Sequence, residues 1–231
     1  MDTAKDARVL VLEDALRRLG EIISNRKLKL HLEYSRLSQL IQTASTALYE
    51  VKYSYVDPMQ LAASEGTKKI VDCVSEIGVM MHSAIASVGF KPKTTKEQLV
   101  VAELNYALRT VEGFQRRLKS GSDEAGLAVD ILAVEVSQTR PVAGASKLTH
   151  CRCSDGKRAW NIVTNIAGIR VGSKLPCAVL PPVEMMDTVS EAMFLGGDPL
   201  PEGTPLGPIV APSRQMLDQA RAQTLRIIER L

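Results

Sequence analysis

The chain has 231 residues, of which 45% are hydrophobic and 24% charged, and its formal net charge is +3. These values are typical of a globular protein with room for two modest domains or one large one. No stretch approaches the roughly 20 apolar residues that a membrane helix needs. The acidic N-terminus MDTAKDARVL lacks the basic start of a secretory signal. We therefore expect a cytoplasmic protein without a membrane segment.

The first 120 residues show apolar positions every three or four residues, the pattern of amphipathic helices. This periodicity predicts helices over residues 3–24, 30–55, 58–88 and 95–119. Asp57 and Pro58 form a helix start, Gly66 marks a possible interruption, and Thr95 with Gln98 forms a capping box. The second and third helices, at about 30 residues each, would be about 45 Å long at ~1.5 Å per residue.

Four helices joined by short connectors predict an antiparallel bundle. The sustained three-four seam favours self-association, and we expect a homodimer. The bundle contains no Glu-x-x-His pair that would indicate a di-iron site. Its basic clusters at 26–29, 91–93 and 116–119 are interpreted as solvated helix ends, with an extended nucleic-acid surface as the alternative.

A polar, glycine-containing linker follows, and after it the hydrophobic period changes from 3.6 to 2. Strand-like runs then occur at 128–137, 148–154, 158–164, 174–180, 191–195 and 207–211. Several short strands at close spacing predict a small β-barrel or sandwich. Asp155-Gly156 predicts a tight type I′ turn between the second and third strands. From residue 213 the pattern is helical again.

Charge is unevenly distributed within this β region. Residues 140–174 contain seven Lys or Arg and one acid, for a net charge of +6, whereas residues 175–212 contain five acids and no base. A basic stripe is the electrostatic footprint of phosphate contacts. The alternative is chance clustering on a solvated surface.

Cysteine chemistry offers no catalytic or metal site. Cys151 and Cys153 would share one face of a strand, with His150 on the other. Zinc would need two further ligands from Cys73, Cys177 and three histidines. His150 beside Cys151 is the one candidate nucleophile–base pair, and strand neighbours point apart. We therefore expect reduced structural cysteines, no metal, no cofactor and no enzymatic activity.

About 80 residues carry a resemblance to a known family. The matching pieces are, in order, Val134-Glu-Val-Ser137, Arg140-Pro141, Ala145-Ser-Lys-Leu148, Cys151-Arg-Cys-Ser-Asp-Gly156, Asn161-Ile-Val-Thr-Asn165, Val171-Gly-Ser-Lys174, Ser190-Glu-Ala-Met193 and Pro201-Glu-Gly-Thr204. Their order and spacing resemble the tRNA-binding OB-fold domain appended to methionyl-tRNA synthetases and to the bacterial phenylalanyl-tRNA synthetase β chain. The same domain occurs in free-standing structure-specific tRNA-binding proteins.

The resemblance completes the expected fold and its division. We predict an α+β protein with a helical bundle at 1–120, a linker at 121–127, an OB-fold barrel at 128–212 and an amphipathic helix at 213–231. OB barrels bind polynucleotides on the face of strands two and three. The candidate RNA-binding residues are Arg140, Lys147, Arg152, Lys157, Arg158, Trp160, Asn161, Thr164, Asn165, Arg170, Lys174, Ser190 and Met193.

These residues have different expected roles. Lys147, Arg152, Lys157 and Arg158 would neutralise phosphates, and Asn161, Thr164 and Asn165 would contact sugars or base edges. Trp160 would stack on an unpaired base, a contact worth about 1–3 kcal/mol. Its alternative is a place in the barrel core or in a dimer contact.

Three departures from the family pattern bear on affinity. Ala192 replaces a usual glycine, residues 185–189 lack the usual basic residues, and the loop after Pro141 is about two residues longer. We expect a non-catalytic protein that binds tRNA by shape and backbone, as a possible accessory factor to an aminoacyl-tRNA synthetase. The alternative is a protein-interaction scaffold or chaperone-like dimer that uses the barrel as a docking surface.

Overall fold

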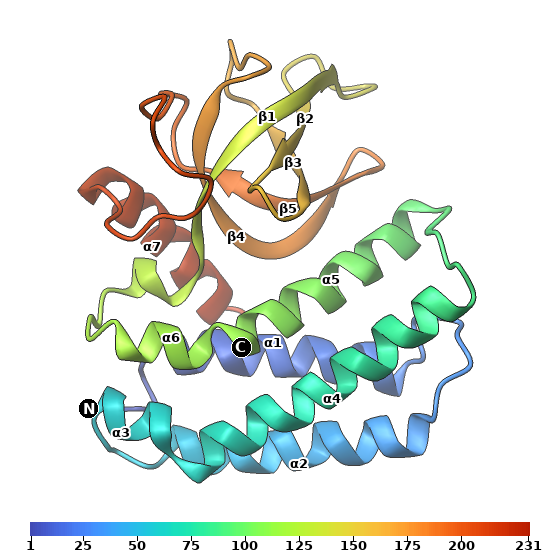
Figure 1. The fold of residues 1–231 in the computed structure, drawn as a ribbon, viewed down its shortest axis with the longest axis vertical. Coiled ribbons are helices and arrows are strands. Elements are labelled where there is room, and N and C mark those ends of the chain that lie inside the picture. The colour runs from blue at the N-terminus through green and yellow to red at the C-terminus, as the bar shows by residue number, and fades with distance from the viewer.

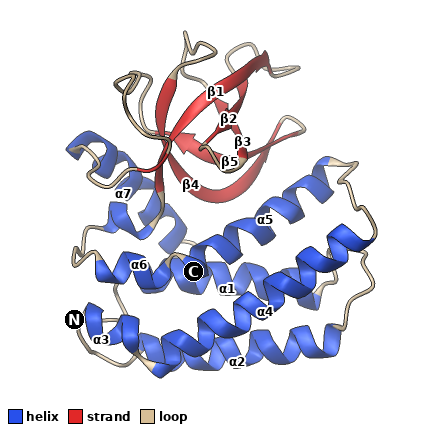
Figure 2. Cartoon of the chain, viewed as in Figure 1, coloured by secondary structure: helices blue, strands red, loops and turns tan.

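A computed structural model of the protein describes all residues from 1 to 231 and has an α+β fold. A helical region lies along one side of an antiparallel sheet (Figures 1 and 2). The helices are α1 (Ala7–Ser24), α2 (Tyr34–Lys52), α3 (Pro58–Ala63), α4 (Glu65–Ser87), α5 (Thr95–Glu112), α6 (Phe114–Lys119), the 3₁₀ turn η1 (Ala125–Ala128) and α7 (Arg214–Ile228). The strands are β1 (Ile131–Pro141), β2 (Thr149–Ser154), β3 (Ala159–Thr164), β4 (Lys174–Met185), β5 (Thr188–Phe194) and β6 (Gly207–Pro208).

Side-chain caps mark the starts of α3, α4 and α5. The Asp57 carboxylate accepts hydrogen bonds from the backbone N–H groups of Met59 and Gln60, as the sequence predicts for the start of α3. The predicted interruption is confirmed at Ser64, which leaves the helical conformation and caps α4. The capping box of α5 lies one residue earlier than predicted, because it is formed by Thr94 and Glu97.

Two predicted helices are shorter than expected. Residues 25–33 are not helical, so α2 has 19 residues, and α4 has 23 after the break at Ser64. The predicted helix over 95–119 is split at Gly113 into α5 and α6. A Cβ at Gly113 would clash with a terminal guanidinium nitrogen of Arg117. The absence of a side chain at Gly113 therefore leaves room for Arg117 to turn inward.

The sheet is built around its first strand. Its order is β3-β2-β1-β4-β5, all neighbours are antiparallel, and β6 adds a short pairing to β1. The predicted runs at 148–154 and 158–164 correspond to β2 and β3 within one residue. The six strands do not close into a ring through backbone pairing.

Side chains of β5 bridge the gap to β3. The backbone N–H of Val163 donates to Ser190 Oγ at 2.9 Å, and the backbone N–H of Asn161 donates to Glu191 Oε2 at 3.0 Å. Arg158 also pairs with Glu191 at 2.5 Å. An unpaired buried backbone donor is costly, so these contacts satisfy the free edge of β3.

The helical region and the sheet share one hydrophobic core. Helix α5 packs against β4 and β5 on one side and against α1 and α4 on the other (Figure 1). A continuous apolar cluster runs from Leu12 in α1 through Ala107 in α5 to Trp160 in β3. The two regions are thus joined by packing as well as by the chain.

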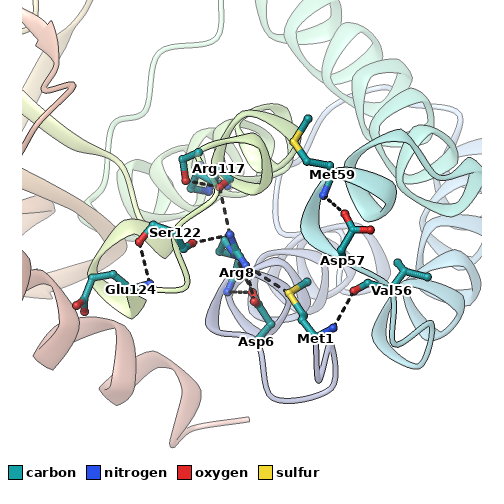
Figure 3. Close-up of polar contacts among 10 residues, drawn as sticks. Met1, Asp6, Arg8, Val56, Asp57, Met59, Arg117, Ser122 and Glu124 are labelled. Atoms are coloured by element: carbon teal, nitrogen blue, oxygen red, sulfur yellow. Dashed lines mark hydrogen bonds and ion pairs between the residues drawn. The ribbon is translucent and has the colours of Figure 1, made fainter.

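The segment between helices and sheet is held by a buried arginine. Arg8, only 3% exposed, donates to the Ser122 carbonyl at 2.7 Å and to the Arg117 carbonyl at 3.5 Å (Figure 3). It also pairs with Asp6 at 2.7 Å. The Arg117 carbonyl lies in the last turn of α6, where intrahelical donors are missing, and the Ser122 carbonyl follows the helix. The predicted linker at 121–127 is therefore fixed to α1 and includes the start of η1.

Helix α4 has the length and mean hydropathy of a membrane span, and 28% of that window is buried. A helix in a protein core meets the same criteria, and α4 packs against α2 and α5.

Candidate nucleic-acid interface

The outer face of β1, β2 and β3 carries aligned polar side chains. Arg140 of β1 lies opposite His150 of β2, and Gln138 lies opposite Arg152. Arg152 in turn lies opposite Asn161 of β3. Residues two apart in a strand share a face, so these side chains form two adjacent cross-strand rows.

The inner face of β2 holds two thiols. Cys151 and Cys153 are fully buried, as predicted, with His150 on the other face. Burial raises the pKa of Cys151 to about 11 and that of Cys153 to about 12. Both are therefore protonated and unreactive at neutral pH. No group of three or more His, Cys, Asp or Glu side chains is placed to hold a metal ion.

Five of the predicted cations are exposed and form no ion pair within the chain. They are Arg140 and Arg152 on the strands and Lys147, Lys157 and Arg170 on the connecting loops. Asn165, at the end of β3, is also exposed. We call these six residues the basic face. Unpaired, hydrated cations of this kind are available to phosphate groups.

Four other predicted polar residues are engaged within the fold. Arg158 is paired with Glu191, and Asn161 hydrogen bonds to Glu191 and to His150. Thr164 is buried and accepts from the backbone N–H of Ile166. Lys174 donates to the carbonyls of Glu202 and Thr204. These four side chains are therefore engaged within the fold and are not part of the basic face.

The last two predicted residues, which the resemblance contributed, lie away from the basic face. Ser190 is buried and bridges β5 to β3. Met193 is half-buried and lines a groove between β4, β5 and α7.

Trp160 lies in the core, which was the alternative to stacking on a base. Its side chain is 1% exposed, so it offers no surface on which a base could stack. The guanidinium carbon of Arg158 lies 3.8 Å from the indole ring centre, and that of Arg109 lies 5.2 Å away. The tryptophan therefore joins β3 to α5 through packing and cation–π contact.

The reversal between β2 and β3 differs from the predicted turn. Ser154 pairs with Ala159, so the loop has four residues and the two-residue type I′ turn is wrong. Gly156 has a φ of +86°, but Asp155 does not adopt a positive φ. Instead, its carboxylate accepts from the backbone N–H groups of Lys157 at 2.9 Å and Arg158 at 2.8 Å. This Asp-centred turn leaves the Lys157 side chain exposed.

The same hydrogen bonds control the ionisation of Asp155. Burial alone would raise the pKa of this carboxyl, but the donors from Arg158 and Lys157 hold it below its ordinary value. Asp155, the one acid in residues 140–174, is thus only 5% exposed and points into the fold, away from the surface.

Sequence reasoning missed a buried charge cluster beside the site. Asp130, just before β1, pairs with Arg109 at 2.8 Å, Arg116 at 2.7 Å and Arg117 at 3.0 Å. Arg117 is 5% exposed, so the prediction that 116–119 is a solvated helix end is wrong for this residue. In the sequence, the one local sign that this segment turns toward the sheet is Gly113, a glycine inside the predicted helix.

A family model described as an alpha helical domain matches residues 1–121. The chain belongs to this family. The match covers α1 to α6 and ends before the sheet begins. None of the curated proteins compared with the chain matches it.

Proposed function

We propose that the protein is a non-catalytic RNA-binding protein that binds tRNA on the basic face. The observation that carries this proposal is the group of exposed, unpaired cations on β1, β2 and their loops. Such a face supplies phosphate contacts without base-specific readers, which suits recognition of folded RNA by shape and backbone.

The strand arrangement supports the proposal. β1 pairs with both β2 and β4, while β3 and β5 lie alongside each other and are bridged by side chains. We infer from this arrangement a partly open five-stranded barrel of the OB type, a fold whose strand 2–3 face binds oligonucleotides. The basic face includes Arg152 on β2, and Lys147 and Lys157 lie in the loops on either side of that strand. We further propose that such binding serves an aminoacyl-tRNA synthetase, as the resemblance implies.

A salt titration of bulk tRNA binding tests the proposal. Filter binding would compare the protein with the variant Arg140→Ala/Arg152→Ala and with the control Lys68→Ala/Lys69→Ala, whose exposed lysines lie on α4. Each phosphate contact contributes about 0.7–0.9 units of slope in log K against log salt. We expect the Arg140→Ala/Arg152→Ala variant to lose about 1.4–1.8 units of slope and the control to keep the slope of the wild type.

The result that would overturn this function is equally direct. No complex with bulk tRNA at micromolar protein in about 50 mM salt would contradict phosphate binding, because electrostatic affinity is greatest at low salt. If Arg140→Ala/Arg152→Ala and Lys68→Ala/Lys69→Ala lost equal slope, the effect would be a non-specific result of lower positive charge.

A further inference from the structure

A groove of about 260 Å³ lies between the second half of β4, β5 and the last turns of α7. Its apolar lining is aliphatic and includes Val183, Met185 and Met193. Val183 and Met185 are each 38% exposed, so the groove is open to water along β4. Pockets that enclose a small molecule usually measure about 300–1,000 Å³. A smaller, open groove of this kind suits a short segment of another chain that lies across it.

The charged side chains that line the groove are all arginines: Arg18, Arg226 and Arg230. Arg18 is already paired with Asp14 and Glu103. Arg226 and Arg230, at the end of α7, are exposed and form no ion pair. Two arginines without acidic partners therefore border the apolar lining, and the charge that complements them is negative.

No acidic side chain of the protein lines the groove. Glu184 lies between Val183 and Met185 in β4, so its side chain projects from the opposite face of the strand. Glu229, which caps the C-terminal end of α7, is exposed, is not part of the lining and forms no ion pair. The groove thus presents positive charge that the chain leaves without an acidic partner.

The apolar lining favours a peptide over RNA as the source of the complementary negative charge. It contains no aromatic side chain, whereas unpaired bases bind by stacking on aromatic rings. It does contain Met185 and Met193, and methionine has a flexible, polarizable side chain that adapts to varied apolar partners. Aliphatic side chains of a peptide fit such a surface.

We propose that this groove binds a short acidic segment of a partner protein. Aliphatic side chains of the segment pack against Val183, Met185 and Met193, while its Asp or Glu carboxylates pair with Arg226 and Arg230. Hydrogen bonds between arginine and a carboxylate are charge-assisted and stronger than neutral ones. The two arginines are four residues apart, about 6 Å along a helix axis, so two carboxylates with a similar separation engage both.

This site is separate from the basic face and goes beyond the proposed function. Arg140 and Arg152 lie on β1 and β2, and neither lines the groove. Binding of the acidic segment therefore does not depend on binding of tRNA, and Arg140→Ala/Arg152→Ala should keep the wild-type affinity for such a segment.

Three labelled peptides test the chemistry of the groove. Fluorescence anisotropy would compare fluorescein-labelled EELLEELL with QQLLQQLL, which lacks the charge, and with EESSEESS, which lacks the apolar side chains. We expect saturable binding of EELLEELL below about 200 μM, a concentration above the micromolar dissociation constants of weak specific interfaces. Each of the other two peptides should bind at least 10-fold more weakly, because it offers only one of the two kinds of contact.

Charge reversal in the protein assigns the binding to the groove. Arg226→Glu/Arg230→Glu should weaken binding of EELLEELL at least 10-fold and should bind labelled KKLLKKLL instead, because opposite charges then face each other. Val183→Ser/Met185→Ser should also weaken EELLEELL binding, through loss of apolar contact. The matched control is Lys68→Glu/Lys69→Glu, which makes the same change of net charge at exposed residues of α4 and should keep the wild-type affinity.

Four results would overturn the proposal. The first is no saturable binding of EELLEELL, and the second is equal binding of QQLLQQLL or EESSEESS. The third is an equal loss of affinity in the groove variants and in the α4 control. The fourth is a different occupant: a loss of tRNA affinity in Arg226→Glu/Arg230→Glu without any peptide binding would assign the groove to RNA, and a wild-type dimer that this variant dissociates would assign it to a second copy.

Discussion

Asp130 joins the helices to the start of the sheet through a buried charge cluster. It is 7% exposed and receives three arginines, two from α6 and one from α5. Burial alone would raise the pKa of Asp130, but the charges of Arg117, Arg109 and Arg116 hold it below its ordinary value. The buried guanidinium of Arg117 depends on this carboxylate, because a buried charge without a partner is strongly destabilising.

Replacement of Asp130 by Asn should therefore lower the free energy of unfolding by about 3–5 kcal/mol at neutral pH. The folded-state pKa is depressed, so this contribution is present above the unfolded pKa of about 3.9 and is lost as pH falls through the lower folded value. Urea unfolding between neutral and acid pH would measure both effects. The difference between wild type and variant should shrink below about pH 4.

The exposed, unpaired Asp123 supplies the control for this prediction. Asp123→Asn should change stability by less than about 0.5 kcal/mol. A stability gap for Asp130→Asn that stays constant down to strong acid would show that the carboxylate charge is not what holds Arg117.

At the scale of elements, a glycine allows η1 to contact α7. A Cβ on Gly126 would lie 2.6 Å from the carbonyl oxygen of Leu217, which is backbone of α7 and cannot rotate away. Gly126 does not have a positive φ, so the requirement is close approach and not backbone conformation. The terminal helix is thus seated on the segment that leads into β1.

Gly126→Ala should destabilise the protein by about 1–3 kcal/mol, because the added methyl group forces α7 away from η1. Gly203→Ala is the matched control, since a Cβ there meets no atom within 4 Å and its φ is not positive. Thermal unfolding of the two variants measures the difference. Equal transition temperatures would mean that α7 shifts without cost.

At the scale of the whole molecule, the shared core predicts a single unfolding transition. Trp160 is the one tryptophan of the chain and lies where β3 meets α5. Its fluorescence therefore reports on the junction, while far-ultraviolet circular dichroism reports chiefly on the helices. Because Leu12, Ala107 and Trp160 belong to one apolar cluster, the two probes should give coincident urea transitions. Separate midpoints would show that helices and sheet unfold independently despite their contact.

The sequence alone determined the local elements and much of the candidate site. Hydrophobic period separated helices from strands, Asp57 and Gly66 marked the start and the interruption of the third helix, and the alternation in β2 placed Cys151 inside and Arg152 outside. These features depend on residues a few positions apart, which a linear pattern contains. The cations of residues 140–174 were therefore predictable as candidates, although two of them, Arg158 and Lys174, are engaged within the fold.

Only the tertiary structure decided which charges are free and which are used. Arg117 and Arg152 look alike in sequence, yet Arg117 is buried against Asp130 and Arg152 faces water. Likewise, the choice between base stacking and a core position for Trp160 was decided by its contact with α5, a helix about 50 residues earlier in the chain. Such pairings depend on which distant surfaces meet when the shared core forms, and local periodicity does not encode that choice.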